Sequence, residues 1–188
     1  MFLIVSGNPK ADGLCASVVD EVRRGVVDGG GAAETLTVAE LARCHVCGDG
    51  WGTCLKARRC AFGGDGFDEA QARVGAADRL CLVTPVYWGE MAEGLKSFLD
   101  RLRRCDNAMR GQGVLAGKPV LLIASPGGSG GGGLTCLDQM DRFCRHTGAV
   151  IFDHILVNRW NQDYKRAAAY AAARALAEGR EPGVTVEK

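Results

Sequence analysis

The chain has 188 residues, 47% of them hydrophobic and 24% charged, with a formal net charge of +1. This composition excludes a disordered chain, and the near-neutral charge gives no electrostatic reason to expect nucleic acid or an anionic membrane as a partner. No apolar run approaches the roughly 20 residues that a bilayer crossing needs. The nine cysteines are an odd number, and residues 1–5 lack the basic flank of a secretory leader. We therefore expect a reduced, cytoplasmic protein.

Apolar runs alternate with helix-period patterns along the chain. In chain order, we predict a strand over 2–6, a helix over 13–27, strands over 35–38 and 79–84 with a helix over 67–76 between them, a helix over 92–104, a strand over 120–125, a helix over 133–147, a strand over 149–157 and a helix over 164–178. Such strands separated by helices indicate a parallel sheet covered on both faces. The predicted fold class is α/β: a doubly wound five-stranded sheet of order 2-1-3-4-5, with residues 1–188 forming one domain.

Ligands of such sheets bind beyond the carboxyl ends of the strands. The first strand ends in Ser6-Gly-Asn8-Pro-Lys10 and leads into a helix near Gly13. The free N–H groups and the positive dipole end of a helix start make an anion site, to which Ser6 and Asn8 could add donors and Lys10 a charge. The Walker A pattern is absent, so a monophosphate fits better than a triphosphate. An ordinary strand-to-helix turn is the alternative.

The third strand leads into Thr84-Pro-Val-Tyr-Trp-Gly-Glu-Met91, which carries two adjacent aromatic residues. Tyr87 and Trp88 offer flat apolar faces that suit stacking on a heterocycle, and Gly89 permits close backbone contact. The alternative is an apolar plug over the core. The ligand reading is favoured because the aromatic pair follows a strand at the expected binding edge.

The fourth strand leads into Ser125-Pro-Gly-Gly-Ser-Gly-Gly-Gly-Gly133. This run connects a core strand to a helix, so a flexible interdomain linker is a poor explanation. Its glycines allow positive φ and bring backbone amides close to a planar ligand. The run also satisfies G-x-G-x-x-G, but in so glycine-rich a segment that match is weak support for a dinucleotide fingerprint.

These segments carry a family resemblance. Thr84–Met91, followed by Leu95-Lys-Ser-Phe-Leu-Asp-Arg101, is similar to the "P-x-Y-x-G" loop and "LK-x-F-x-DR" helix of the flavodoxin-like NAD(P)H-dependent FMN reductases. The first loop resembles that family's "GSPRKGGNT" phosphate turn. The cysteine segment resembles that of the iron–sulfur flavoproteins within the family. The likeness spans roughly residues 2–157 and implies a flavodoxin-like fold with FMN as cofactor.

The resemblance also implies a set of cofactor-binding residues. They are Asn8, Lys10, Gly13, Cys15 and Ala16 around the phosphate; Pro85, Val86, Tyr87, Trp88 and Gly89 beside the ring; and Ser125, Gly127 and Gly128 on its other side. Ser6, expected as a donor from the first loop itself, completes the predicted cofactor site. The chain departs from the family at Cys15, where a threonine hydroxyl is usual, and at Asp12, an acid beside the expected phosphate.

Four cysteines lie in a segment, about 43–66, that has no periodicity and is predicted to be an elaborated loop. Cys44, Cys47, Cys54 and Cys60 are spaced C-x2-C-x6-C-x5-C, whereas iron–sulfur flavoproteins carry a more compact motif. Three readings stay open: a [4Fe–4S] cluster on four thiolates, a zinc ion with His45 as a substitute ligand, or a metal-free loop. The other cysteines, Cys15, Cys81, Cys105, Cys136 and Cys144, are expected to be mostly small buried hydrophobes.

The predicted function is an FMN-dependent oxidoreductase that passes electrons from NAD(P)H to a small acceptor such as a quinone or free flavin. Trp88 and Trp51 are candidates to line the acceptor pocket. One alternative is an iron–sulfur flavoprotein that acts as an electron-transfer module. Another is a binding domain for a different ligand on the same fold. The resemblance implies a homodimer or tetramer, and neither nucleic acid nor a membrane is expected as a partner.

Overall fold

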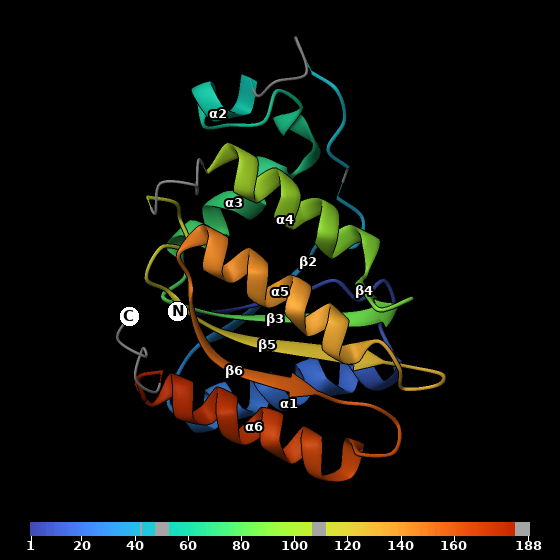
Figure 1. The fold of residues 1–188 in the computed structure, drawn as a ribbon. Helices are drawn as coiled ribbons and strands as arrows, with labels where there is room; N and C mark the ends of the chain where they lie inside the picture. The colour runs from blue at the N-terminus through green and yellow to red at the C-terminus, as the bar shows by residue number, and fades with distance from the viewer. Residues whose placement is uncertain (42, 48–52, 107–111, 183–188) are drawn as a thin grey trace, which may run out of the picture.

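The computed structural model describes residues 1–41, 43–47, 53–106 and 112–182. A twisted sheet lies between two layers of helices (Figure 1). The elements are β1 (Phe2–Ser6), α1 (Gly13–Asp28), β2 (Ala33–Thr37), α2 (Thr53–Ala57), a 3₁₀ turn (Gly63–Asp65), α3 (Phe67–Ala76), β3 (Arg79–Tyr87), β4 (Glu90–Met91), α4 (Glu93–Cys105), β5 (Pro119–Pro126), α5 (Gly133–Thr147), β6 (Val150–Leu156) and α6 (Gln162–Ala177).

The sheet order is β2-β1-β3-β5-β6, with all four pairings parallel. This confirms the predicted doubly wound order, since these are the five predicted strands in sequence. The prediction of five strands and a loop over 84–91 was wrong in one respect. β3 runs on to Tyr87, and the two-residue strand β4 pairs with it in antiparallel fashion. A two-residue strand is too short to leave a periodic pattern in the sequence.

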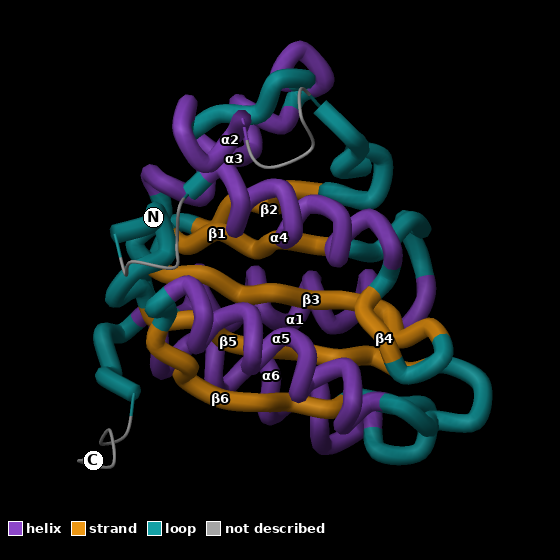
Figure 2. Tube along the Cα trace, turned by 45° about the horizontal axis from the view of Figure 1, so that its top comes forward, coloured by secondary structure: helices purple, strands orange, loops and turns teal. Residues whose placement is uncertain are grey.

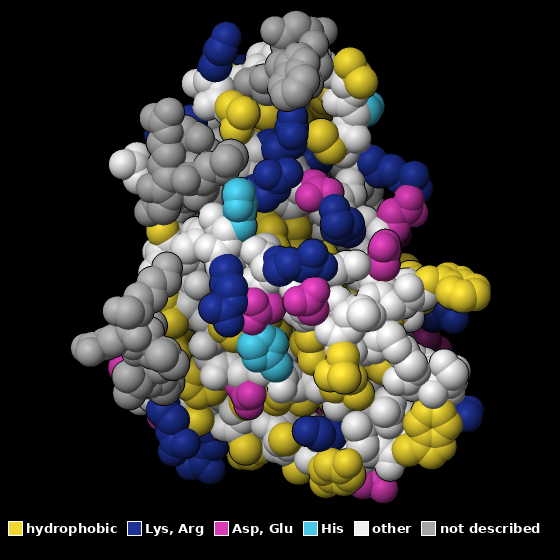
Figure 3. All heavy atoms as spheres, viewed as in Figure 1, with side chains coloured by type: hydrophobic (Ala, Val, Ile, Leu, Met, Phe, Trp, Pro, Cys, Tyr) yellow, Lys and Arg dark blue, Asp and Glu magenta, His cyan; other side chains and the backbone are white. Residues whose placement is uncertain are grey.

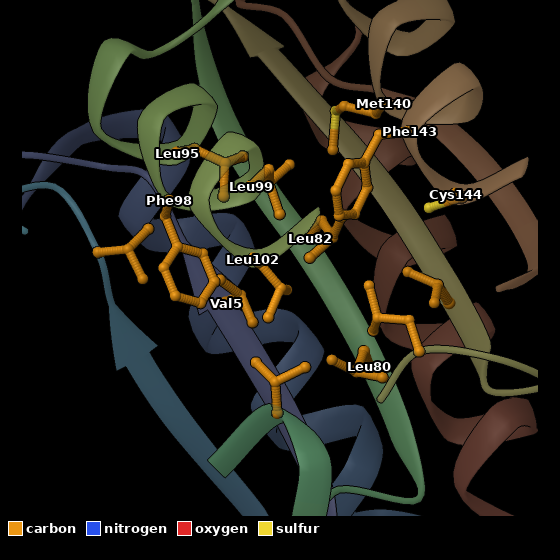
Figure 4. Packing of buried hydrophobic residues seen from close by; sticks show 14 of the residues in the cluster. Val5, Leu80, Leu82, Leu95, Phe98, Leu99, Leu102, Met140, Phe143 and Cys144 are labelled. Carbon is orange, nitrogen blue, oxygen red and sulfur yellow. The ribbon is translucent and has the colours of Figure 1, made fainter. Parts of the chain in front are cut away.

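The two faces of the sheet bury separate hydrophobic clusters, and Figure 2 shows the helices on either side of the strands. On one face, α4 and α5 contribute Leu95, Phe98, Leu102 and Phe143 against strand residues such as Leu82 (Figure 4). On the other face, α1 and α6 pack together over β1, β3 and β5. Burial on both faces explains why the central strands read as continuous apolar runs.

The outer surface of α4 and α5 carries charges of both signs (Figure 3). Ion pairs one helical turn apart join Lys96 to Asp100 on α4, and Arg142 to Asp138 on α5. Exposed pairs of this kind contribute little to stability. None of the helices in the described part of the chain has the length and apolar character that a bilayer crossing requires.

The cysteine segment has more structure than the predicted loop. Within its described residues, α2 and the 3₁₀ turn form two short helical pieces, which lie over the end of α4 together with α3 (Figure 1). Both pieces are too short to produce a helical period in the sequence. Trp51 lies outside the described residues.

Candidate functional site: a strand-edge cavity and a thiol cavity

The loops that follow β1, β3 and β5 line a single cavity of about 800 Å³ at the carboxyl edge of the sheet. Twelve predicted site residues line it: Asn8, Lys10, Gly13, Cys15, Pro85, Val86, Tyr87, Trp88, Gly89, Ser125, Gly127 and Gly128. Three segments that are far apart in sequence therefore meet, as the position of their strands predicts. A cavity of this volume is in the range of small-molecule and cofactor sites.

The first loop is braced by its own side chains. Asn8 donates from Nδ2 to the Lys10 carbonyl at 2.6 Å, and Asn8 N–H donates to Ser6 Oγ at 3.3 Å. Ser6 and Ala16 line a smaller hollow on another side of this loop rather than the large cavity. Two of the predicted phosphate donors, Ser6 and Asn8, thus shape the turn through local contacts.

Helix α1 begins at the cavity wall, and the first N–H groups of any helix have no partner within the helix. Its N-cap residue, Asp12, makes no side-chain capping bond, and the first turn contains no acidic residue. Helix α5 begins at the same cavity with Gly132 as an uncapped N-cap residue. Two positive helix ends and the cation Lys10 therefore face one cavity. The carboxylate of Asp12 lines the same cavity and offsets part of this positive charge. Burial raises the pKa of the Cys15 thiol to about 12, so this side chain presents a neutral S–H.

The aromatic loop is a two-residue hairpin between β3 and β4. Trp88 and Gly89 both have positive φ, at 53° and 82°, as the tightest hairpin turns require. A tryptophan seldom adopts such a backbone conformation, and this one is fully exposed. The turn presents Trp88 and half-exposed Tyr87 at the cavity instead of packing them into the core.

The glycine loop closes against this hairpin. A Cβ added to Gly132 would lie 2.5 Å from the Cα of Gly89, so the two backbones touch. A Cβ added to Gly127 or Gly128 would meet no atom within 4 Å, so these positions border open space. Ser125 lies on the same wall, and its buried Oγ has no hydrogen-bond partner. A buried unpaired hydroxyl that lines a cavity is suited to hydrogen bonding with a ligand.

A second cavity, of about 280 Å³, is lined by the four predicted metal ligands, Cys44, Cys47, Cys54 and Cys60. We call it the thiol cavity. Cys105 of α4 is a fifth thiol in its lining, and Arg101 and Arg104 add two cations. All five cysteines are free. Among the residues that the structure describes, no three or more Cys, His, Asp or Glu side chains are arranged to hold a metal ion.

Arg101 fastens the cysteine segment to α4. Its buried guanidinium pairs with Asp65 through both carboxylate oxygens, at 2.6 and 3.1 Å. It also donates to Cys60 Sγ at 3.2 Å and lies 4.1 Å from the Phe67 ring centroid. The hydrogen bond from Arg101 lowers the pKa of Asp65, which keeps this carboxylate charged. A single side chain of α4 thereby contacts Cys60 and Asp65 of the cysteine segment and the first residue of α3.

Sequence reasoning missed several residues at these sites. Cys105 is one helical turn after Arg101, so the two residues share a face of α4, but no sequence signal places the cysteine segment against that face. Thr135 and Gly132 line the large cavity, and Trp160 packs against Gly130 of the glycine loop. No sequence signal links Trp160 to that loop, because only the return from β6 to α6 brings it there.

The fold is that of a flavodoxin-like α/β protein, with a cavity at the carboxyl ends of the strands. The family "NADPH-dependent FMN reductase" matches residues 1–162. The chain therefore belongs to this family, as the sequence resemblance predicts.

Known proteins resemble the chain in sequence or in fold. The chain is 28% identical over 134 residues to an iron–sulfur flavoprotein of Methanosarcina thermophila, covering 69% of this chain and 64% of that protein. Solved structures with a similar fold include a flavone reductase (TM-score 0.72, 16% identity, 95% of this chain and 62% of that one). Another is an NAD(P)H:quinone oxidoreductase from Methanothermobacter marburgensis (TM-score 0.69, 16% identity, 96% and 98%). The chain thus spans less than two thirds of the length of the first two.

Proposed function

We propose that this protein binds FMN in the strand-edge cavity and transfers electrons from NAD(P)H to a small acceptor, such as a quinone or free flavin. The convergence of the three predicted loops on one cavity carries the proposal, and membership of the FMN reductase family supports it. The quinone oxidoreductase among the structural neighbours supports the choice of acceptor class.

The residues present fit the cofactor. The start of α1, where Asp12 makes no capping bond, offers backbone N–H groups for the phosphate. Ser125 offers an unpartnered buried hydroxyl, and Gly127 and Gly128 leave room for a flat ring beside the backbone. FMN, when bound, supplies the hydride and electron chemistry itself. The chain would hold the phosphate at α1, place the ring between the hairpin and the glycine loop, and leave exposed Trp88 to contact an incoming aromatic acceptor.

Turnover tests the proposal. FMN-loaded protein is expected to oxidise NADH or NADPH when benzoquinones or free riboflavin are supplied, measured as loss of nicotinamide absorbance. Protein from which FMN has been removed is the control and should be inactive. Loaded protein that consumes neither nicotinamide with any of these acceptors would contradict the proposed activity while leaving FMN binding intact.

The replacement Ser125→Ala separates ligand binding from folding. The Ser125 hydroxyl is buried without a partner, so its removal should leave the unliganded protein as stable as the wild type or slightly more stable. FMN affinity should fall about fivefold, the value of one hydrogen bond of about 1 kcal/mol. Titration with FMN and thermal unfolding measure the two quantities. Unchanged FMN affinity would remove Ser125 from the proposed site.

A second candidate function is an iron–sulfur electron-transfer module. It is favoured by the gathering of Cys44, Cys47, Cys54 and Cys60 around one cavity beside two arginines, and by the iron–sulfur flavoprotein among the relatives. Four thiols are a suitable donor set for a cluster, although they are not gathered in ligand geometry. Zinc held by the same thiols remains the other metal reading.

Anaerobic reconstitution with iron and sulfide tests this candidate. About four irons per chain are expected for a [4Fe–4S] centre, with loss of the iron in Cys60→Ala. The control Cys144→Ala changes a buried thiol outside the thiol cavity and should retain the iron. Iron far below one cluster per chain would reject the cluster, and stoichiometric zinc uptake would favour the zinc reading.

A further inference from the structure

Two buried thiols of the thiol cavity come from different parts of the chain. Cys54 lies in α2 and is 7% exposed, whereas Cys105 ends α4 and is 1% exposed. α2 packs directly on α4, and both thiols line the same cavity. Burial, with a further contribution from the neighbouring Cys54, raises the pKa of the Cys105 thiol to about 12, so the two thiols lie close together in this cavity. Of the five thiols in the cavity, these two are the buried ones.

Cys54 has two competing uses. It is the third of the four predicted metal ligands, whereas Cys105 lies far beyond Cys60 and outside that spacing. A covalent bond from Cys54 to Cys105 would take one thiolate out of the four-cysteine set. Reversible cysteine pairs in reducing compartments are usually catalytic or redox-sensing rather than structural.

We propose that Cys54 and Cys105 are a redox-active pair that closes to a disulfide in the metal-free protein, so that the oxidised thiol cavity cannot bind a metal through Cys54. The oxidant class is a low-molecular-weight disulfide that carries carboxylates, because the cation Arg104 lines the cavity that it must enter. Exposed Cys44 and His45 border the same cavity and mark its open side. This inference goes beyond the proposed FMN chemistry and requires neither FMN nor a cluster.

The reaction balances as two successive exchanges. Cys54, the more accessible thiol, attacks one sulfur of the small disulfide RSSR, breaks its S–S bond and releases one RSH. Cys105 then attacks the Cys54 sulfur of the mixed disulfide and releases the second RSH. The two cysteine protons end on the two released thiols. The protein pair is oxidised by two electrons, and RSSR is reduced by two.

The test uses the full chain, stripped of metal, reduced under anaerobic conditions and then equilibrated with oxidised glutathione. Acid quenching, alkylation and peptide mass mapping identify the product. The expected product is one cross-linked peptide that joins Cys54 to Cys105, lacks two hydrogens and is cleaved by dithiothreitol. Cys105→Ala and Cys54→Ala should each abolish it, whereas Cys144→Ala, which changes a buried thiol of α5, should retain it.

Two further measurements keep the test decisive even if a variant fails to fold. Thermal unfolding confirms that each variant retains a cooperative transition, and the wild-type map alone already decides which cysteines pair. A cross-link from Cys54 to Cys47 or Cys60, or glutathione adducts without any internal cross-link, would overturn the proposal. Cadmium uptake, read by thiolate absorbance, should be lower in oxidised than in reduced wild type, and equal uptake would overturn the exclusion of metal.

Discussion

Replacing Arg101 with alanine is expected to lower the free energy of unfolding by about 3 kcal/mol, the lower end of the range for breaking a buried ion pair. The guanidinium is buried, and the Asp65 carboxylate that it pairs with is 23% exposed, so water offsets part of the loss. The variant also loses the contacts with Phe67 and Cys60. Urea denaturation should show the loss, and the melting temperature should fall by about 10 °C.

The matched control is Arg145→Ala, which removes an Arg–Asp pair on the exposed surface of α5. Its arginine is 73% exposed, so the expected loss is below about 1 kcal/mol. If both variants lost the same free energy of unfolding, the buried Arg101–Asp65 pair would stabilise the protein no more than the exposed Arg145–Asp141 pair. Arg101 would then not anchor the cysteine segment.

The Arg101 effect should also depend on pH. Arg101 holds the pKa of Asp65 below the ordinary value of 3.8, so the unfolded chain binds this proton more readily than the folded chain. The stabilisation is therefore present above pH 3.8 and is lost as the pH falls through the lower folded-state pKa. The difference in free energy of unfolding between wild type and Arg101→Ala should therefore become smaller below about pH 4. What remains at low pH is the contribution of packing against Phe67. A difference that widens on acidification would contradict the assignment.

Replacing Gly132 with alanine is expected to weaken FMN binding at least about tenfold, a loss of about 1.4 kcal/mol. The new Cβ would lie 2.5 Å from Gly89 Cα and 2.8 Å from Gly89 N, so the hairpin that carries Tyr87 and Trp88 must move away from the glycine loop. Positive φ at Gly132 adds backbone strain. FMN titration and thermal unfolding of the unliganded protein measure the two effects.

The control variant Gly117→Ala separates the effect of backbone strain from the effect of the steric clash with Gly89. Gly117 has nearly the same φ, 74° against 75°, but a Cβ there would meet no atom within 4 Å, and the residue lies outside the strand-edge cavity. We expect a stability loss of about 1 kcal/mol with FMN affinity unchanged. If the two variants bind FMN equally well, contact between the hairpin and the glycine loop does not shape the site.

The sheet order and the meeting of the three loops were predictable because parallel strands bring their carboxyl ends to one edge. Asn8, Tyr87 and Gly127 could be assigned to that edge from their strand positions alone. The hairpin strand β4 was not predictable, since two residues carry no periodicity. The treatment of residues 1–188 as one domain stays a prediction.

The thiol cavity was only partly predictable. The spacing of Cys44, Cys47, Cys54 and Cys60 indicated a cluster of thiols, but spacing describes local order only. Cys105 enters the cavity through the packing of α2 on α4, a contact between distant segments. The pairing of Arg101 with Asp65 is likewise long-range, so neither partner could be chosen from the sequence.

The central claim is that the three strand-end loops form one FMN site. Titration of the metal-free chain with FMN, followed by flavin fluorescence, tests it most directly. The expected result is saturation at one FMN per chain, with quenching by Tyr87 and Trp88 and a melting temperature that rises with FMN concentration. Fluorescence that stays equal to that of free FMN, with an unchanged melting temperature, would contradict it.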